Sequence, residues 1–102
     1  MKYINLKDGQ TISGEFVKFF KGQYGVNMVL SNGEEEFAFT IKNAVLKNVI
    51  RKNIGKFVKG TEVTITRIGL EKNRYIIYKV LINGKDISDY DLTLEEIIDL
   101  LK

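Results

Sequence analysis

The chain has 102 residues, of which 44% are hydrophobic, and carries a formal net charge of +3 at pH 7 with no cysteine and no histidine. This content fits one folded domain and excludes thiol nucleophiles, disulfides, imidazole bases and most zinc sites. Because these chemical groups are missing, we expect no cofactor, no metal ion and no enzymatic activity. No apolar run approaches the roughly 20 residues of a membrane span, and the N-terminus lacks the apolar region of a signal peptide. We therefore expect a cytoplasmic protein with no membrane partner.

The first part of the chain predicts strands separated by glycine turns, since the sequence contains no proline. β-branched and aromatic residues dominate these runs, as is typical of strands. Gly14 within the long second run predicts a bulge or a sharp bend, and Asn32-Gly33 predicts a hairpin turn. The expected strands cover residues 10–21, 26–30 and 36–41, and residues 2–6 could form a further short strand ahead of them.

The pattern changes to helical spacing over residues 43–54, where apolar residues recur every three or four positions. Asn43 or Thr40 can cap the first turn of this helix, and Gly55 lies where the helix should end. Strand signals then return in two runs, 61–69 and 74–82.

The C-terminal part of the chain differs in charge from the rest. Residues 1–84 carry 14 Lys and Arg against 7 Asp and Glu, a net charge of +7, whereas residues 85–102 carry 2 Lys against 6 acids, a net charge of −4. Thr93 with Glu96 forms a capping box. We therefore expect a domain over 1–84 and an acidic tail over 85–102 with a short amphipathic helix, whose apolar residues are Leu94, Ile97, Ile98 and Leu101.

This order of elements is that of the OB-fold, a partly open Greek-key barrel. Short connections make neighbouring strands antiparallel. The expected fold class is therefore mainly β: a five-stranded OB-fold barrel with a helix between strands 3 and 4, plus a short C-terminal amphipathic helix. A small barrel of the SH3 type lacks a full helix at that place, while a split α+β sheet stays open as an alternative.

The loops that flank the ligand groove of an OB-fold are basic and aromatic in this sequence. Ligands in this fold lie across the second and third strands, between the loops that join strands 1–2 and 4–5. Lysines attract phosphates, and flat rings stack on unpaired bases. The residues expected to bind nucleic acid are Lys18, Phe19, Lys21, Tyr24, Arg67, Lys72, Arg74, Tyr75 and Lys79.

Some of these side chains and their neighbours could instead pack in the core or shape the backbone. Phe16 and Phe20 share one side of the long strand and are expected in the core, whereas Phe19 suits core packing as well as it suits a ligand. Arg67 continues an apolar alternation, which predicts either a bulge near the strand end or a functional side chain. The acidic run 34–36 would repel phosphates, and we expect it to point away from the groove.

The layout of OB-order strands, basic-aromatic loops and an acidic C-terminal segment over residues 10–102 resembles the small single-stranded DNA-binding proteins of bacteriophages and mobile elements. The resemblance rests on architecture and composition, with no diagnostic motif. It implies a protein that coats unpaired DNA during DNA replication or recombination, without sequence preference, and an acidic tail that recruits replication or recombination proteins. The cellular family ends in a flexible acidic tip closing on a proline and an aromatic residue, whereas this chain ends in "IIDLLK".

Two alternatives stay open. The same basic and aromatic residues would serve an RNA-binding OB domain, which only matched DNA and RNA strands can separate from a DNA-binding one. The chain could instead be a protein-interaction or assembly module, for example a homodimer, that works through the apolar face of its C-terminal helix.

Overall fold

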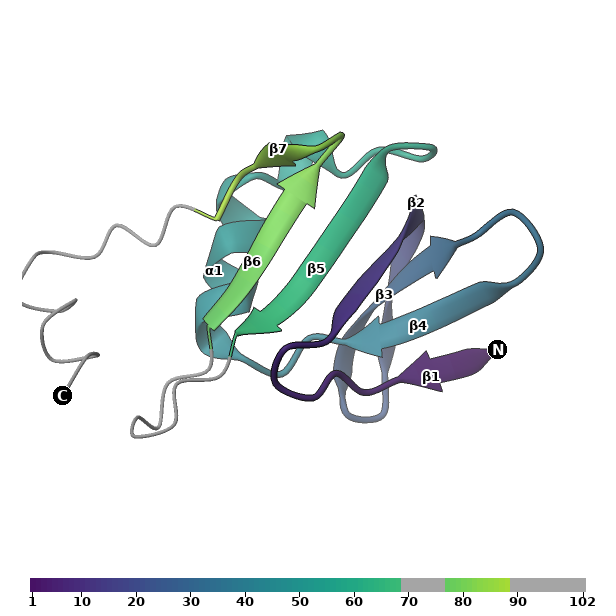
Figure 1. Cartoon of the computed structure of the whole chain (residues 1–102). Helices are drawn as coiled ribbons and strands as arrows, with labels where there is room; N and C mark the ends of the chain where they lie inside the picture. Colours follow the sequence, from purple (N-terminus) through teal and green to yellow (C-terminus); the bar gives the residue numbers. More distant parts are fainter. Residues whose placement is uncertain (69–76, 89–102) are drawn as a thin grey trace, which may run out of the picture.

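Strands make up most of the regular structure in the computed structural model, which describes residues 1–68 and 77–88 (Figure 1). The elements in chain order are β1 (Lys2–Ile4), β2 (Thr11–Gly22), β3 (Gly25–Ser31), β4 (Glu36–Thr40), α1 (Ala44–Lys52), the 3-10 helix η1 (Ile54–Lys56), β5 (Glu62–Ile68), β6 (Ile77–Ile82) and β7 (Lys85–Asp86). The mainly β class and the helix between β4 and β5 are therefore confirmed.

The sheet has more strands than the expected five-stranded OB-fold barrel and is not closed into one. The described strands form one seven-stranded sheet in the order β1-β4-β3-β2-β5-β6-β7. All neighbours are antiparallel except β1 and β4, which are parallel. Because β1 occupies the free edge of β4 and β7 the free edge of β6, these two strands do not pair to close a barrel. Figure 1 shows the two halves of the sheet on either side of β2, with α1 behind β5 and β6.

The long strand β2 belongs to both halves of the sheet, and two features let it change direction. Its first five residues pair with β5, and the residues from Glu15 onward pair with β3. At Gly14 a Cβ atom would lie 2.9 Å from the carbonyl oxygen of Ser31, closer than real Cβ contacts allow. A bulge follows between Phe16 and Lys18, where the register with β3 shifts. The bend expected at Gly14 thus coincides with crowding against β3, and the bulge lies just beyond it.

The bulge reverses the alternation of side chains along β2. Phe16 is buried in the core, and Phe19 packs against the core from the same side. Phe20 is half-buried and lies outside the core cluster, which corrects the expectation that it shares the core with Phe16. An extra residue in a strand shifts all later side chains to the other face, and the simple two-residue period missed this.

The core lies between the inner face of the sheet and α1. The helix contributes Leu46, Val49 and Ile50. As expected, the side chain of Asn43 caps it, accepting a hydrogen bond from the backbone N–H of Leu46 at 2.9 Å. The helix ends at Lys52 and continues into η1, slightly earlier than the sequence pattern predicts. The largest fully buried side chains are Met28, Leu30, Leu46, Ile65, Val29, Val63 and Val80.

β7 carries the sheet past the domain boundary expected at residue 84. Ile87, directly after β7, is buried in the core cluster. Ser88 then donates hydrogen bonds to the Asp86 carboxylate from its hydroxyl group and from its backbone N–H, the latter at 2.8 Å. These bonds hold the pKa of Asp86 below its ordinary value. The expected C-terminal helix lies outside the described residues. Within 1–68 and 77–88, no helix has the length and apolar character that crossing a membrane requires.

Candidate nucleic-acid interface

The candidate interface begins with a row of side chains across four strands, on the side of the sheet away from the core, here called the outer face. The directly paired residues in this row are Lys18 on β2, Val29 on β3, Ala38 on β4 and Tyr3 on β1. Val29 and Ala38 are fully buried but lie outside the core cluster. Lys18 is exposed, and Tyr3 is 59% exposed. The row therefore places a cation and an accessible ring on either side of a small apolar strip.

A second row, nearer the β2–β3 hairpin, runs from Phe20 through Asn27 to Thr40. The Asn27 side chain is only 3% exposed, so its polar atoms need partners. Its Oδ1 accepts a hydrogen bond from the Thr40 hydroxyl at 2.5 Å, and its Nδ2 lies 3.4 Å from the Gly25 carbonyl oxygen. A Cβ at Gly22 would come within 2.5 Å of Nδ2. A side chain at Gly22 would therefore displace the Asn27 amide, which links the hairpin to Thr40 of β4.

The hairpin that joins β2 and β3 presents Tyr24 at its tip. Gly22 pairs with Gly25, so the turn consists of Gln23 and Tyr24. Gly25 adopts φ +125°, a conformation that favours glycine. Tyr24 is 76% exposed, the most exposed aromatic ring among the described residues. The turn chemistry therefore holds a ring in solvent where a base could stack on it.

Lys18 and Lys21 are both exposed, but the alternation of β2 directs them to opposite sides of the strand. Lys21 pairs with Val26 at the hairpin end of the sheet. A strand of nucleic acid that contacts Lys18 would thus have to pass the hairpin to reach Lys21. One ligand can therefore contact Lys18, Lys21 and Tyr24 together, as expected, only if it bends around the tip of the hairpin.

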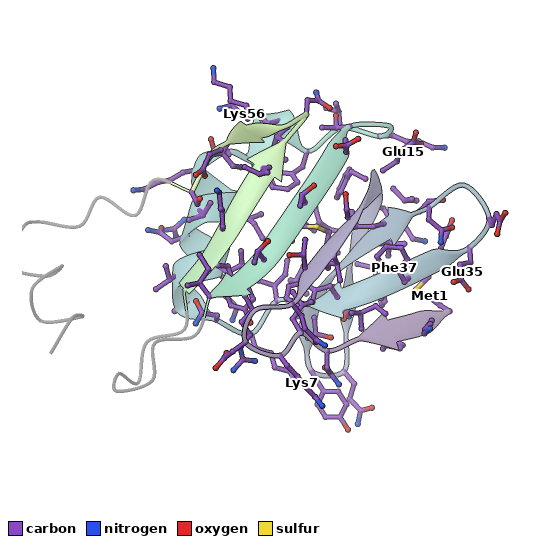
Figure 2. All side chains as sticks on the ribbon, in the orientation of Figure 1. Met1, Lys7, Glu15, Glu35, Phe37 and Lys56 are labelled. Atoms are coloured by element: carbon purple, nitrogen blue, oxygen red, sulfur yellow. The ribbon has the colours of Figure 1, made fainter. Side chains whose placement is uncertain are left out.

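Acidic side chains gather at the other end of β3. Glu15 on β2 pairs with Glu62 on β5 on one side and with Ser31 on β3 on the other. Ser31 pairs in turn with Glu36 on β4. A polar pocket of about 240 Å³ lies there, lined by Ser13, Gly14, Glu15, Ser31, Asn32, Gly33 and Glu62. Figure 2 shows Glu15 at the upper right, Glu35 at the right edge and Lys7 at the lower side.

The acidic end limits the candidate interface. Glu36 lies in the row next to that of Lys18, on the same face, so the expectation that residues 34–36 point away does not describe this glutamate. A phosphate chain on the outer face would be repelled here and favoured toward the hairpin.

Arg67 has a structural role in this arrangement. Its Nε lies 2.8 Å from the Asp8 carboxylate, and its Nη1 donates to the carbonyl oxygen of Leu6 at 2.9 Å. Backbone hydrogen bonds add to this link, from Gly9 to Arg67 and from Arg67 to Gln10. The guanidinium group therefore fixes the segment between β1 and β2 against the end of β5, and no bulge is needed to explain an arginine here.

Two other predicted residues, Phe19 and Lys79, do not lie on the outer face of β1–β4. The ring centroid of Phe19 is 4.8 Å from that of Phe16 and 5.6 Å from that of Phe57, which places it in an aromatic cluster at the core. Lys79 is exposed on β6, beside Thr66 of β5. The predicted residues Lys72, Arg74, Tyr75, Leu94, Ile97, Ile98 and Leu101 lie outside the described residues.

Tyr3 and Phe20 are the interface residues that sequence reasoning missed. A strand as short as β1 shows too little alternation to assign a face to Tyr3, and the bulge inverted the face assigned to Phe20. The described ranges hold no cluster of three or more His, Cys, Asp or Glu side chains placed to bind a metal ion. Comparisons with protein-family models, curated proteins and solved structures give no match.

Proposed function

We propose that this protein binds single-stranded DNA without strong sequence preference, in replication or recombination, on the outer face of β1–β4 and around the β2–β3 hairpin. In this proposal the rings stack on unpaired bases and the lysines contact phosphates. The described residues assigned to this surface are Tyr3, Lys18, Phe20, Lys21 and Tyr24. Lys72, Arg74 and Tyr75 stay in the proposal on the strength of the sequence.

The observation that supports it most is the exposed ring of Tyr24 at the tip of a hairpin that carries two lysines. The run from Phe16 to Leu30 contains no Asp or Glu. Tyr24 is held out in solvent although burying an aromatic ring is favourable. Stacking on a base would cover this ring, and a lysine beside it would meet the adjoining phosphate.

A single strand suits this surface better than a duplex. Rings can stack only on bases that are unpaired, whereas a duplex is read by a helix or a β-ribbon that enters a groove. The row from Lys18 to Tyr3 crosses three strand spacings, about 14 Å, on a sheet rather than on a protruding element. An extended strand that crosses this row could contact Lys18 and Tyr3 at its two ends, since Val29 and Ala38 between them are fully buried.

The test is fluorescence anisotropy of labelled oligo-dT, oligo-rU and a duplex of equal length, at low and moderate salt. We expect tight, salt-sensitive binding of oligo-dT and weak binding of the duplex. Tyr24→Ala should weaken oligo-dT binding by about 5- to 150-fold, since stacking contributes about 1–3 kcal/mol per base. Tyr24→Phe retains the ring and is the matched control, with circular dichroism to confirm that both variants fold.

Two results would count against this function. Absence of oligo-dT binding at low salt would refute it and would turn attention to the protein-interaction alternative. Equal binding of duplex and single strand would exclude stacking as its basis. Tighter binding of oligo-rU than of oligo-dT would assign the same surface to RNA.

A further inference from the structure

The loop that follows α1 displays two aliphatic side chains among lysines. Ile54 is 56% exposed and Val58 is 57% exposed, although most aliphatic residues in the described chain are buried. Lys56 and Lys59 are exposed beside them. Figure 2 shows Lys56 extending away from the body of the protein. This loop, residues 53–60, is remote in sequence from the β2–β3 hairpin and from Tyr3.

The loop is anchored in this position. Phe57 is buried, with its ring centroid 5.8 Å from that of Phe16. The backbone N–H of Phe57 donates to the carbonyl oxygen of Ile54 at 3.2 Å, and that of Gly60 donates to Phe16 at 2.9 Å. Phe57 and these two hydrogen bonds thus hold the loop against the core, while Ile54 and Val58 on either side of Phe57 face solvent.

The loop belongs to a basic stretch of the chain that ends before Glu62, the first residue of β5. Residues 37–61 contain six basic side chains and no acidic one; the six are Lys42, Lys47, Arg51, Lys52, Lys56 and Lys59. On α1, Lys47 and Arg51 are exposed. Arg51 donates to the neutral side chain of Asn48 at 2.8 Å, a contact that leaves its charge uncompensated. A surface of this kind attracts anionic partners.

We propose that the loop of residues 53–60 binds the surface of an anionic phospholipid bilayer, with Ile54 and Val58 entering the interface and the lysines contacting lipid headgroups. Aliphatic side chains with basic neighbours suit this interface, because lysine stems can lie along acyl chains while their ammonium groups stay among the phosphates. This departs from the expectation of no membrane partner, which rested on the lack of a spanning segment. Surface binding needs no span.

Two other partners fit the loop less well. Unpaired bases stack on rings, and this loop exposes aliphatic side chains instead, so a nucleic acid would gain little from Ile54 and Val58. Protein interfaces are depleted in lysine and enriched in aromatic residues, methionine and arginine. A lysine-rich loop with two exposed aliphatic residues departs from that composition.

The test is co-sedimentation of the full chain with phosphatidylcholine vesicles that contain or lack phosphatidylserine. We expect binding only to the vesicles with phosphatidylserine, weakened by added salt. Combining Ile54→Ser with Val58→Ser should reduce the bound fraction by about tenfold, because the apolar contribution is removed. Val26→Ser, which changes an exposed aliphatic residue at the hairpin, is the matched control and should bind vesicles like the unchanged chain.

The result that overturns the proposal is absence of binding to phosphatidylserine vesicles at low salt, or binding that the double variant leaves unchanged. Oligo-dT binding by the double variant separates the two surfaces. We expect it to be unaltered, and a loss of oligo-dT affinity with vesicle binding unchanged would assign the loop to nucleic acid. Thermal unfolding of the double variant should match that of the unchanged chain, since both substituted side chains are mostly exposed.

Discussion

Asn27 and Gly22 show how single residues determine the shape of the candidate interface. The Asn27 amide is buried beside the hairpin, where it links the Thr40 hydroxyl and the Gly25 backbone. A side chain at Gly22 would occupy the space of this amide. Because an unsatisfied buried polar group costs free energy, the amide and its partners hold the hairpin in one position. The position of Tyr24 at the tip is therefore determined by the hydrogen bonds of Asn27.

Gly14 is the second residue at which the backbone has no room for a side chain. We predict that Gly14→Ala lowers the free energy of unfolding by about 1–3 kcal/mol, since the new Cβ would press on the backbone of β3 and force a shift in a packed region. Urea denaturation measures this change. Gly55→Ala is the control, because no heavy atom lies within 4 Å of its Cβ position and its φ is not in the left-handed region. Equal stability of the two variants would contradict the crowding at β3.

At the scale of elements, α1 depends on its cap. We predict that Asn43→Ala lowers the free energy of unfolding by about 1 kcal/mol, the usual effect of losing an N-cap side chain. Asn48→Ala is the matched control, since Asn48 is exposed and its side chain contacts Arg51 on the helix surface. The change should be within about 0.5 kcal/mol for this control. Thermal and urea unfolding of the pair would show whether the cap matters, and equal losses would argue against it.

Elements governed by local chemistry could be predicted from the sequence, and those governed by distant pairing could not. The α1 cap at Asn43 and the turn at Asn32-Gly33 follow from short-range hydrogen bonds and backbone preferences, and both lie where expected. The parallel pairing of β1 with β4 joins Tyr3 to Ala38 across a long stretch of chain, and no local pattern specifies it. The bulge after Phe16 likewise depends on the two different partners of β2.

The same division applies to the candidate interface. The exposure of Tyr24 and Lys21 could be predicted, because a glycine-flanked turn exposes its residues in almost any hairpin. Arg67 could not be assigned from its strand alone, because its role comes from Asp8 and Leu6, which the fold brings beside it. Phe19 depended in the same way on Phe57, a partner from a different element. The alternating pattern of a strand therefore fails for residues whose role depends on contacts with other elements.

Across the whole molecule, charge is divided between regions. Glu15, Glu36 and Glu62 lie in neighbouring positions at one end of the sheet, and the hairpin at the other end has lysines and no acid. Residues 37–61, which include α1 and the loop after it, hold six basic side chains and no acidic one. This division lets one protein present two basic surfaces, one with rings and one with aliphatic side chains, whose different chemistry suits different anions.

The salt dependence of the proposed DNA binding can test which of these basic surfaces contacts phosphates. Each phosphate contact on a single strand contributes about −0.7 to the slope of log K against log salt concentration, because a counterion is released. We predict that Lys18→Gln and Lys21→Gln each make the slope for oligo-dT less negative by about 0.7, with weaker binding at low salt. Lys47→Gln removes an exposed charge on α1 and should leave the slope unchanged. If Lys47→Gln changed the slope and the other two did not, the phosphates would lie along α1, and the outer face of β1–β4 would not be the DNA-binding surface.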